Sequence, residues 1–475
     1  MKKVLALLLA AVMVFALCAC GQQAAPAAAP AAEAPAAAPA EAEAPAEAPA
    51  APEGKIKIHF MSFTTEVPDM VTKFLEVRPD LAEKYYVDEP TIVATTDQLY
   101  QPALDQALAA GGEDAPDIYC AEAAFILKYA QGDAADYAAA YEDLGIDVAA
   151  ETAAAEIAPY TIDIGTRPSD GKLVGLGYQS TGGAFIYRRS IAKDVWGTDD
   201  PAVVAEKIGA GTNSWDAFFA AAEELKAKGY KIVSGDGDIW HAVENSSPAG
   251  WIVDDKLNID PAREAFLDLS NKLYVNEYHN DTQDWQEGWF ADMKKAGNVL
   301  GFYGPAWLIN YTIAANCGEG DESSYGDWAC CAPNIGFFWG GTWVLANKDV
   351  VGTDKEEFVR EFIRWVTLDA SETGLQYFWA NGTLNGEGGT KDDVAAGAVL
   401  KISNGEMDFL GGQDMFEVFV PANAYANGKN LTQYDEAINA EWRDAVRGYN
   451  AGTYTRDEAI EAFKTAVSDK LGIDA

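Results

Sequence analysis

Hydrophobic and polar residues first alternate with a period of two and then recur at helical spacing. Residues 55–60 (KIKIHF) alternate polar and apolar side chains before a Ser/Thr-rich turn, which predicts a first strand. Apolar positions within 98–110 follow helical spacing and stop at Gly111, so a helix is expected there. Residues 115–120 (APDIYC) then predict a second strand. The order strand, helix, strand is typical of an α/β unit.

The same order returns further along the chain. Ser214 stands where it caps a helix that Gly229 ends, and residues 230–233 predict a further strand. The apolar face of this helix carries Trp215, Phe218, Phe219, Ala222 and Leu225. Repetition of the pattern predicts that the body of the protein is α/β throughout this part.

Two capping boxes predict later helices. Thr353 is followed three residues on by Glu356, and Thr455 by Glu458, and amphipathic segments follow both pairs. The C-terminal part is therefore expected to be mainly helical. In open α/β sheets ligands bind beyond the carboxyl ends of the strands, so a two-lobed protein of this class is expected to place its site between the lobes.

The N-terminal residues predict secretion and lipidation. Residues 1–3 are Met-Lys-Lys, and an apolar run from Val4 to Leu17 is too short for a permanent membrane span. The run ends in Leu-Cys-Ala-Cys-Gly, which resembles a bacterial lipobox and makes Cys20 the expected acylated residue after removal of a signal peptide, 1–19. An ordinary signal peptide that is discarded together with its cysteines is the alternative.

Residues 20–54 follow as an expected tether. From Gln22 onward the segment consists almost entirely of Ala, Pro and Glu, which lack the β-branched and aromatic side chains that a core needs. About 420 residues remain after it, too many for a single hydrophobic core, so two lobes are expected.

The net charge of the chain limits the kinds of molecule that it is expected to bind. The chain has 34 Lys and Arg against 74 Asp and Glu, a formal net charge of −40. Recognition of phosphates needs clustered basic residues, so nucleic acid and anionic lipid surfaces are not expected as partners, and the membrane is expected to be reached only through the lipid. Neutral or cationic ligands fit better, although a merely solvated acidic surface explains the charge equally well.

Cysteine and histidine give no sign of a metal. The body carries Cys120, Cys317, Cys330 and Cys331, too few for a disulfide scaffold in so long a chain. A bond from Cys317 to Cys330 or Cys331 and four buried free thiols both stay open. Three histidines occur in the whole chain, without ligand spacing, so neither a transition metal nor another cofactor is expected.

Six segments spread over the body form a recognisable series. They are PDIYCAE at 116–122, QSTGGAFIYRR at 179–189, WIVDDKLNIDP at 251–261, GFYGPAW at 301–307, LGGQD at 410–414 and NLTQYD at 430–435. In this order and behind a lipobox, they resemble the carbohydrate-binding extracellular solute-binding proteins (family 1) of ATP-driven importers, the group that includes the maltose-binding proteins.

The resemblance implies a two-lobed periplasmic-binding-protein-like fold of type II. The chain is then expected to cross between lobes near residues 180, 340 and 385. Lobe 1 comprises 55–179 and 341–385, and lobe 2 comprises 180–340 and 386–475. The implied function is that of a monomeric, non-catalytic lipoprotein on the extracellular face of the bacterial cell membrane. It captures a mono- or oligosaccharide and hands it to the permease subunits of an ABC transporter.

Tryptophans are the first candidates for a sugar site, because sugars stack their C–H faces on aromatic rings. Trp307 follows Gly304-Pro305 and Trp339 precedes Gly340-Gly341, so both are expected at turns facing the cleft, with core packing as the alternative. Trp240, at the end of loop 234–238, is expected to join them. Further aromatic candidates are Trp343, Trp289 and Tyr303. Trp215 and Trp365 are assigned to the core, and Trp196 and Trp442 are left unplaced.

Polar residues are the second group of candidates, because their side chains can hydrogen-bond the sugar hydroxyl groups. Glu122 follows a strand, Gln179 sits at the first expected crossover, and Asp236 and Asp238 lie in a glycine-bearing loop. Asp-Gly-Asp also resembles a calcium loop, but the remaining ligands do not follow at the required spacing. Thr64, Thr65, Glu66 and Gln413 form a second group, for which ordinary turn chemistry is the alternative.

Two other functions compete. A lipid-anchored glycoside hydrolase needs two carboxylates roughly 5 to 10 Å apart, and 74 acidic residues do not exclude such a pair, but no hydrolase signature or Gly-x-Ser-x-Gly elbow occurs. A surface adhesin or structural lipoprotein is expected to show repeats of fixed period or a run of short strands, and none is visible outside the tether. A non-catalytic surface glycan-binding protein is a further alternative. The favoured mechanism is closure of two hinged lobes over a bound sugar.

Overall fold

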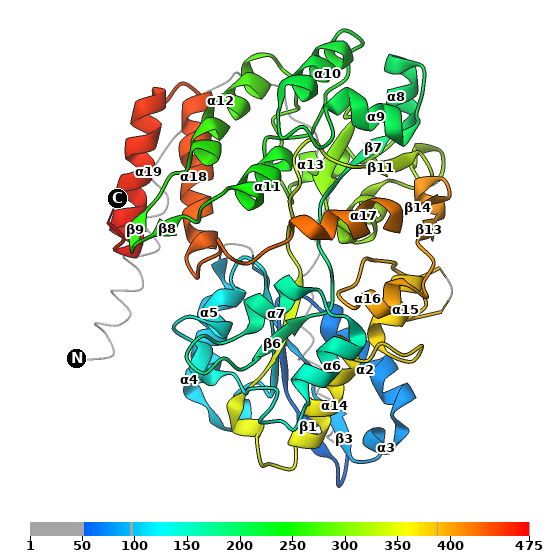
Figure 1. The fold of residues 1–475 in the computed structure, drawn as a ribbon, viewed down its shortest axis with the longest axis vertical. Helices are drawn as coiled ribbons and strands as arrows, with labels where there is room; N and C mark the ends of the chain where they lie inside the picture. The colour runs from blue at the N-terminus through cyan, green and yellow to red at the C-terminus, as the bar shows by residue number, and fades with distance from the viewer. Residues whose placement is uncertain (1–51, 96–97, 387, 475) are drawn as a thin grey trace, which may run out of the picture. The chain divides into compact units, whose positions relative to one another are not determined.

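The computed structural model describes residues 52–95, 98–386 and 388–474. The predicted signal peptide, Cys20 and most of the tether lie outside these residues. The described residues form two lobes, which Figure 1 shows below (blue, cyan and yellow) and above (green and red). No helix in the described ranges is both long and apolar enough to span a lipid bilayer.

The first lobe is built on a five-stranded sheet in the order β4-β2-β5-β12-β6. Its strands are β2 (Phe60–Ser62), β4 (Thr91–Ile92), β5 (Ile118–Glu122), β6 (Gly175–Gly177) and β12 (Thr342–Ala346). Strand β2 is parallel to β4 and β5, whereas β12 is antiparallel to β5 and β6. A segment from late in the chain therefore lies inside the sheet of the first lobe.

Both faces of this sheet are buried. Along β5, Ile118 and Cys120 pack into one hydrophobic layer, and Tyr119 and Ala121 into the other. The first layer contains α2 (Glu66–Val77), α3 (Pro79–Ala82), α6 (Val148–Ala155), α14 (Glu356–Thr367), α15 (Leu375–Asn381) and α16 (Gly397–Leu400). The second contains α4 (Tyr100–Ala110), α5 (Ile126–Ala130) and α7 (Pro159–Gly165). A sheet with helices on both faces is the α/β arrangement expected from the sequence.

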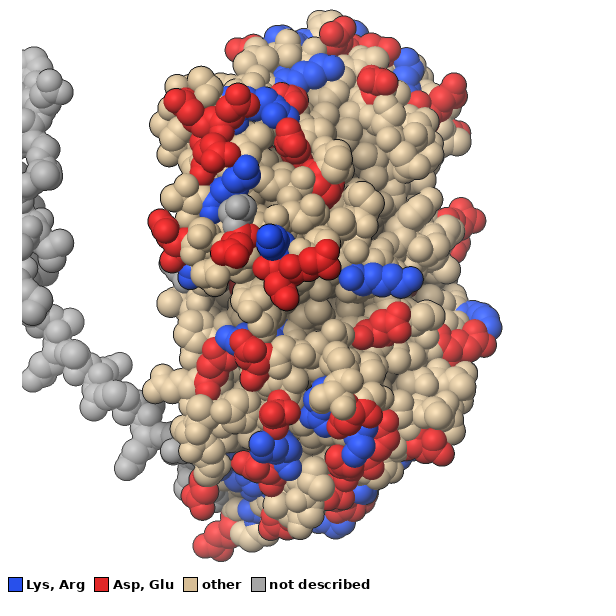
Figure 2. Space-filling model, turned by 60° about the vertical axis from the view of Figure 1, so that its left-hand side comes forward, with Lys and Arg blue, Asp and Glu red and all other residues tan. Residues whose placement is uncertain are grey.

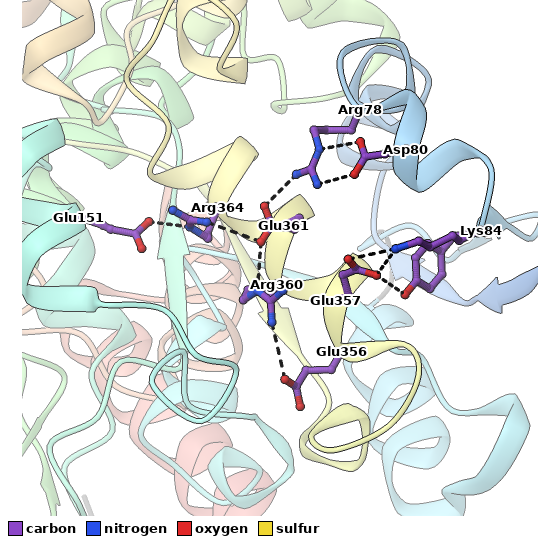
Figure 3. Close-up of polar contacts among 10 residues, drawn as sticks. Arg78, Asp80, Lys84, Glu151, Glu356, Glu357, Arg360, Glu361 and Arg364 are labelled. Carbon is purple, nitrogen blue, oxygen red and sulfur yellow. Dashed lines mark hydrogen bonds and ion pairs between the residues drawn. The ribbon is translucent and has the colours of Figure 1, made fainter.

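Helix α14 is held to its neighbours by a network of ion pairs (Figure 3). Glu361 pairs with Arg78, at the start of α3, at 2.8 Å, and Arg364 pairs with Glu151 of α6, also at 2.8 Å. Arg360 bridges to Glu361 at 3.0 Å. Single exposed pairs contribute little to stability, but this network connects segments that are far apart in the sequence and fixes their register.

The second lobe contains a three-stranded antiparallel sheet. Its order is β10 (Gly301–Gly304), β7 (Ala184–Arg188), β11 (Trp328–Cys331). The helices of this lobe are α8 (Arg189–Trp196), α9 (Pro201–Ile208), α10 (Asp216–Lys226), α11 (Gly237–Ser246), α12 (Pro261–Val275), α13 (Glu287–Ala291), α17 (Phe416–Ala422), α18 (Asp435–Asn450) and α19 (Arg456–Leu471). Two small hairpins, β8 (Ile252–Val253) with β9 (Lys256–Leu257) and β13 (Glu406–Met407) with β14 (Gln413–Asp414), complete it.

The chain passes between the lobes after β6, before β12 and again after α16. The third passage lies later than the expected residue 385, because α16 packs against α6 of the first lobe. Ala396 forms a bridge to Ile157, and Val394 one to Gln179. Residues 388–400 thus belong to the first lobe. After α17 the chain also contacts the first lobe, where Ala426 and Leu431 pack against its second layer.

Several local predictions differ from the structure. The expected strand 55–60 is two strands, because the backbone of His59 turns to hydrogen-bond Asp117, leaving β1 (Ile56–Ile58) to pair separately with β3 (Tyr85–Val87). Residues 230–233 form only a single bridge, from Lys231 to Val299. The capping box of Thr455 and Glu458 is present. That of Thr353 and Glu356 is not, because the helix begins later, after Lys355.

The four cysteines of the body are free thiols. Cys120, Cys317, Cys330 and Cys331 are all buried in the structure and form no disulfide with one another. Burial raises the pKa of the Cys120 and Cys330 thiols to about 12, so they stay protonated and unreactive at neutral pH. Of the two alternatives left by the sequence, the structure has the buried thiols.

Candidate functional site

A cavity of about 570 Å³ lies between the two lobes. The first lobe contributes Thr64, Glu66, Glu122 and Gln179 to its wall, and the second contributes aromatic and acidic residues from the segments that follow α12, β10 and β11. Clefts of about 300 to 1,000 Å³ hold most small-molecule ligands of proteins. The size and the position between lobes make this cavity the candidate site.

Four aromatic rings form the second-lobe wall. We call Trp285, Trp307, Tyr311 and Trp339 the cleft aromatic cluster; all four line the cavity. The centroids of Trp307 and Trp339 are 4.8 Å apart with the rings at 61°, and those of Trp285 and Trp307 are 6.2 Å apart with the rings nearly parallel. Partly exposed ring faces of this kind bind the C–H face of a flat ligand.

The backbone around Trp307 explains how its ring reaches the cavity. Trp307 directly precedes a π-helical turn, Leu308–Ala314, which also carries Tyr311, and π-helical turns are frequent at functional sites. Its indole Nε1 donates to the carbonyl oxygen of Trp339 at 3.1 Å. Gly340 has a φ of +74°, and a Cβ there would lie 3.3 Å from the Trp307 ring and 3.2 Å from a Glu122 carboxylate oxygen. Glycine at this position therefore permits the close approach of the two lobes.

Trp285 adopts an unusual backbone conformation. Its φ is +65°, in the left-handed region that bulky side chains rarely occupy, and its side chain is 44% exposed. Such conformations cost of order 1 to 3 kcal/mol and cluster at ligand sites. The strained backbone of Trp285 holds a large apolar ring at the mouth of the cleft.

His241 supports the cluster from behind. Its ring stacks on Trp339 at a centroid distance of 3.6 Å and an angle of 12°. Burial lowers the pKa of His241, but its ion pairs with Asp284 and Glu244, at 3.5 and 3.8 Å, outweigh burial and raise the pKa above its ordinary value. The stacking on His241 restricts the orientation of the Trp339 ring.

Carboxylates line the rest of the cavity. Glu122 accepts the backbone N–H of Ala124 at 2.7 Å, and burial raises its pKa to about 7, with a further contribution from the charge of Glu436. Burial likewise raises the pKa of Glu436, although a hydrogen bond from Gln101 opposes the rise. Glu66 accepts a hydrogen bond from the Tyr178 hydroxyl, yet burial keeps its pKa raised.

Two buried neutral side chains add further polar atoms to the wall. Gln179 is 5% exposed and donates its amide to Asp392 at 2.9 Å, which leaves its amide oxygen directed to the cavity. Thr342 is 8% exposed, and its hydroxyl makes no hydrogen bond to any described residue. The wall thus combines aromatic faces with hydrogen-bonding atoms, the combination that polyhydroxylated ligands require.

Comparison with known proteins assigns the chain to a family. The family described as bacterial extracellular solute-binding protein matches residues 90–401, well over half of the chain. The chain belongs to the bacterial extracellular solute-binding proteins. No curated protein sequence matches it.

Solved structures resemble this solute-binding protein over nearly all of the described body. The galacto-N-biose/lacto-N-biose I-binding protein of an ABC transporter from Bifidobacterium longum, in complex with lacto-N-biose, is 18% identical, with a TM-score of 0.62 and coverage of 90% of this chain and 100% of that chain. An ABC transporter associated binding protein from B. animalis subsp. lactis, in complex with β-1,6-galactobiose, is 20% identical, with a TM-score of 0.60 and coverage of 87% and 97%.

A third structure is described as an extracellular solute-binding protein of family 1. It is 18% identical, with a TM-score of 0.64 and coverage of 86% of this chain and 99% of that chain. At such identities the similarity establishes the fold. It confirms the predicted two-lobed, periplasmic-binding-protein-like α/β class for this solute-binding protein.

The structure brings six of the residues singled out in the sequence to the cavity of the solute-binding protein. They are Trp307, Trp339, Glu122, Gln179, Thr64 and Glu66. Thr65 lies between two of them, but it occupies the N-cap position of α2 and is not part of the wall. The direct contact of these six residues with a ligand stays a prediction.

The other aromatic candidates lie in the cores. Trp240 is 2% exposed, because the glycine-bearing segment begins helix α11 instead of a loop, and its ring packs 4.7 Å from Phe266. Trp343 lies on β12, where strand alternation turns it into the first lobe, and its Nε1 donates to the carbonyl of Thr161. Tyr303, inside β10, donates to Asn334 at 2.6 Å.

The remaining candidates satisfy local polar groups. Trp289 is buried and donates its Nε1 to Asp238 at 3.0 Å. Asp238 also accepts the backbone N–H groups of Ser234 and Gly235 and thereby closes the turn before α11. Asp236 pairs with Arg443 at 3.0 Å.

Gln413 also has a local role: it bonds both backbone groups of Cys330 and so joins β14 to β11. The described residues contain no cluster of three His, Cys, Asp or Glu side chains suited to a metal ion. Trp289, Asp236, Asp238 and Gln413 therefore stabilise the second lobe instead of facing the cavity.

Several cavity residues were not foreseen. Tyr311 follows Trp307 at a helical spacing of four residues, which predicts that the two share a helix face. Trp285 lies in the polar stretch DTQDWQ, where a core residue is less expected. Asp284 adjoins Trp285 in the same stretch. Glu436 gives no local signal, because it reaches the cavity from helix α18, far from the other wall residues in the sequence.

Proposed function

We propose that this protein captures a saccharide in the cleft between its lobes and presents it, chemically unchanged, to the permease subunits of an ABC importer. The observation that carries the proposal is the cleft aromatic cluster facing Glu66, Glu122 and Gln179 across a cavity of about 570 Å³. The similar proteins in complex with lacto-N-biose and β-1,6-galactobiose support a saccharide as the class of ligand.

The proposed binding mode follows from the chemistry of the two walls. Sugar rings stack their C–H faces on Trp307 and Trp339 of the second lobe, while their hydroxyl groups hydrogen-bond to carboxylate and amide oxygens of the first lobe. A ligand held in this way contacts both lobes at once. Its binding energy therefore favours the arrangement in which the lobes are close together.

Polar contacts at the edge of the cleft join helices and loops of the two lobes. Gln101 of α4 donates to Glu436 of α18, and the backbone N–H of Asp133 donates to Gln433 at 3.1 Å. Isolated polar contacts of this kind contribute about 1 kcal/mol each or less. We propose that they open and re-form as the chain hinges at the crossovers after β6, before β12 and after α16.

The proposal includes a membrane anchor. Acylation of Cys20 and the Ala/Pro/Glu tether hold the body at the extracellular face of the membrane, within reach of the permease, and the protein acts as a monomer. Lysines and arginines on the face shown in Figure 2 are interspersed with acidic residues and form no continuous basic patch.

Calorimetry of the body with a library of neutral and amino saccharides tests the proposal. We expect saturable binding and an unchanged saccharide in chromatography after incubation. Trp307→Ala is expected to weaken binding by about ten- to a hundredfold. Trp196→Phe is the matched control, because Trp196 packs at the end of α8 and bonds Glu224, away from the cavity. Hydrolysis products, or no binding to any saccharide, would overturn the proposal.

A further inference from the structure

The charged residues that line the cleft are all acidic. Of the described residues in its wall, four are carboxylates, and none is lysine, arginine or histidine. They are Glu66, Glu122, Asp284 and Glu436. The wall also contains hydroxyl and amide groups, which donate as well as accept, so the carboxylates are the charged groups to which a ligand is exposed.

Among the residues that the structure describes, Asp284 is the one carboxylate of the four that forms ion pairs, although, against the larger effect of burial, the charge of His241 also lowers the pKa of Glu122. Asp284 pairs with His241 and, at 3.6 Å, with Arg443, and these cations hold its pKa below the ordinary value against the effect of burial. Glu66, Glu122 and Glu436 accept hydrogen bonds only from neutral groups: the Tyr178 hydroxyl, a backbone N–H and the Gln101 amide.

Lys128 forms no ion pair with these carboxylates. Lys128 contributes to the electrostatic surroundings of Glu436, but its ammonium group pairs with Asp105 at 2.5 Å. Burying carboxylates without a cation is costly, and the raised pKa values of Glu66, Glu122 and Glu436 reflect that cost. A positive charge from the ligand relieves it.

Two further side chains indicate that the wall is built to receive donors. Gln179 and Thr342 are both more than nine-tenths buried, line the cavity and have a polar oxygen without a partner among the described residues. The amide nitrogen of Gln179 is already used by Asp392, so the oxygen is the atom left for a ligand. The Gln179 oxygen accepts a hydrogen bond and the Thr342 hydroxyl accepts or donates one, so both oxygens are available to donors of a ligand.

We infer that the ligand is a saccharide with a free amino group, whose ammonium lies between Glu122 of the first lobe and Glu436 of the second. This inference rests on the proposed function and names its substrate class. Charge-assisted hydrogen bonds to carboxylates are about twice as strong as neutral ones. The same ammonium lies close to Trp307, because a Glu122 oxygen and that ring flank the same point beside Gly340, so a cation–π contact adds to the preference.

The charge also determines which saccharides are rejected. N-acetylation removes the positive charge and replaces an ammonium with a larger neutral amide. A uronic or sialic acid places its carboxylate against those of the wall, with no cation in the wall to receive it. The expected order of affinity is amino saccharide, then neutral saccharide, then N-acetylated and acidic saccharides.

Matched saccharides that differ at one substituent test the inference. Calorimetry compares glucosamine, glucose and N-acetylglucosamine, the galactose trio, and the corresponding β-1,4- and β-1,6-linked disaccharides. We expect the amine of the best-binding trio to bind at least about tenfold more tightly than its neutral counterpart, and the ratio to fall as salt is raised. Neutral or N-acetylated members that bind as tightly overturn the amine inference alone. Absence of binding throughout overturns the proposed function as well.

Two variants test whether Glu122 causes the preference for an amino saccharide. Glu122→Gln keeps the shape and a hydrogen-bonding oxygen but removes the charge, so the amine-to-neutral ratio is expected to fall toward one. Glu461→Gln is the control, because Glu461 is exposed on α19 and pairs only with Lys464 among the described residues. An unchanged ratio in Glu122→Gln contradicts the placement of the ammonium, even if the wild-type protein prefers amines.

Discussion

Two groups of tryptophans in the second lobe have nearly the same internal geometry and very different surroundings. In the cleft aromatic cluster the ring centroids are 4.8 to 6.5 Å apart. In the group formed by Trp240, Trp251, Trp442 and Phe463, which we call the core aromatic cluster, they are 4.9 to 6.4 Å apart. Ring spacing alone therefore does not distinguish a binding surface from a core.

The two clusters differ in the burial and the neighbours of their outer ring faces. Every ring of the core aromatic cluster is buried, and Trp251 is further covered by the guanidinium of Arg263 at 4.4 Å. In the cleft aromatic cluster Trp285 and Tyr311 are 44% and 49% exposed, and the open faces look onto carboxylates. The core aromatic cluster buries its apolar surface inside the folded lobe. The cleft aromatic cluster leaves part of its apolar surface open to a ligand.

Removal of a core ring is the strongest way to test this contrast. Trp442→Ala is expected to lower the free energy of unfolding by about 3 to 5 kcal/mol, because the lost ring leaves a cavity among Trp251 and Phe463. Urea unfolding followed by circular dichroism measures the change. A loss of less than 1 kcal/mol would mean that this cluster does not support the lobe.

Removal of a cleft ring is expected to weaken ligand binding and to affect stability less. Trp307→Ala should cost about 1 to 3 kcal/mol of ligand binding and lower the free energy of unfolding by less than Trp442→Ala does, because its ring is only partly buried. Calorimetry and urea unfolding on the same two variants measure both quantities. If Trp442→Ala and Trp307→Ala have the same ratio of binding loss to stability loss, the contrast between the clusters fails.

A pH series separates the acidic wall from the rest of the protein. Folding raises the pKa of Glu122 from an ordinary value of 4.5 to about 7, so the folded state binds this proton more tightly than the unfolded chain. The stabilising contribution is complete below about pH 4.5 and is lost as the pH rises through 7. Glu122→Gln should therefore gain stability relative to the parent, on the order of 2 to 3 kcal/mol, between pH 5 and pH 8.

Urea unfolding at unit steps of pH measures this difference. Asp393 and Asp435, whose pKa values burial also raises to about 7, remain in both proteins, so both are expected to lose stability toward pH 8. The curve of Glu461→Gln should run parallel to that of the parent. A parallel curve for Glu122→Gln would show that Glu122 is ionised without penalty.

The smallest effect is expected at a helix cap that supports the core aromatic cluster. Thr455 and Glu458 form a capping box at the start of α19, the helix that carries Phe463. Thr455→Ala should lower the free energy of unfolding by about 1 kcal/mol and leave ligand affinity unchanged. Thr465→Ala, in the middle of the same helix, is the control and should cost less. Equal losses would assign no stability to the cap.

The sequence was informative where local patterns decide structure. Alternating strands and amphipathic helices predicted the α/β class, and the Thr455–Glu458 box marked the true start of a helix. At Thr353 the same pattern failed, because the Glu356 carboxylate bonds the backbone N–H of Gly352 and the helix begins later. A capping pattern therefore predicts a helix nearby, while the exact start depends on which backbone groups remain free.

The site was less predictable, because its wall is assembled from distant segments. Turn residues beside Trp307 and Trp339 correctly indicated that their rings leave the core, and both line the cavity. The same argument misplaced Trp240, since Gly237 opens a helix in place of a loop. Trp343 depends on the alternation of β12, and Glu436 on the packing of α18, and neither is visible before the lobes are assembled.

The position of β12 between β5 and β6 has a consequence for how the chain acquires its structure. A fragment that ends before residue 342 contains four strands of the first sheet but lacks the one that joins β6 to the others. The first lobe must therefore wait for the complete second-lobe sheet to be synthesised before its own sheet can close. Such distant pairing makes folding slow, and it leaves apolar surface of the first lobe exposed until β12 has been synthesised.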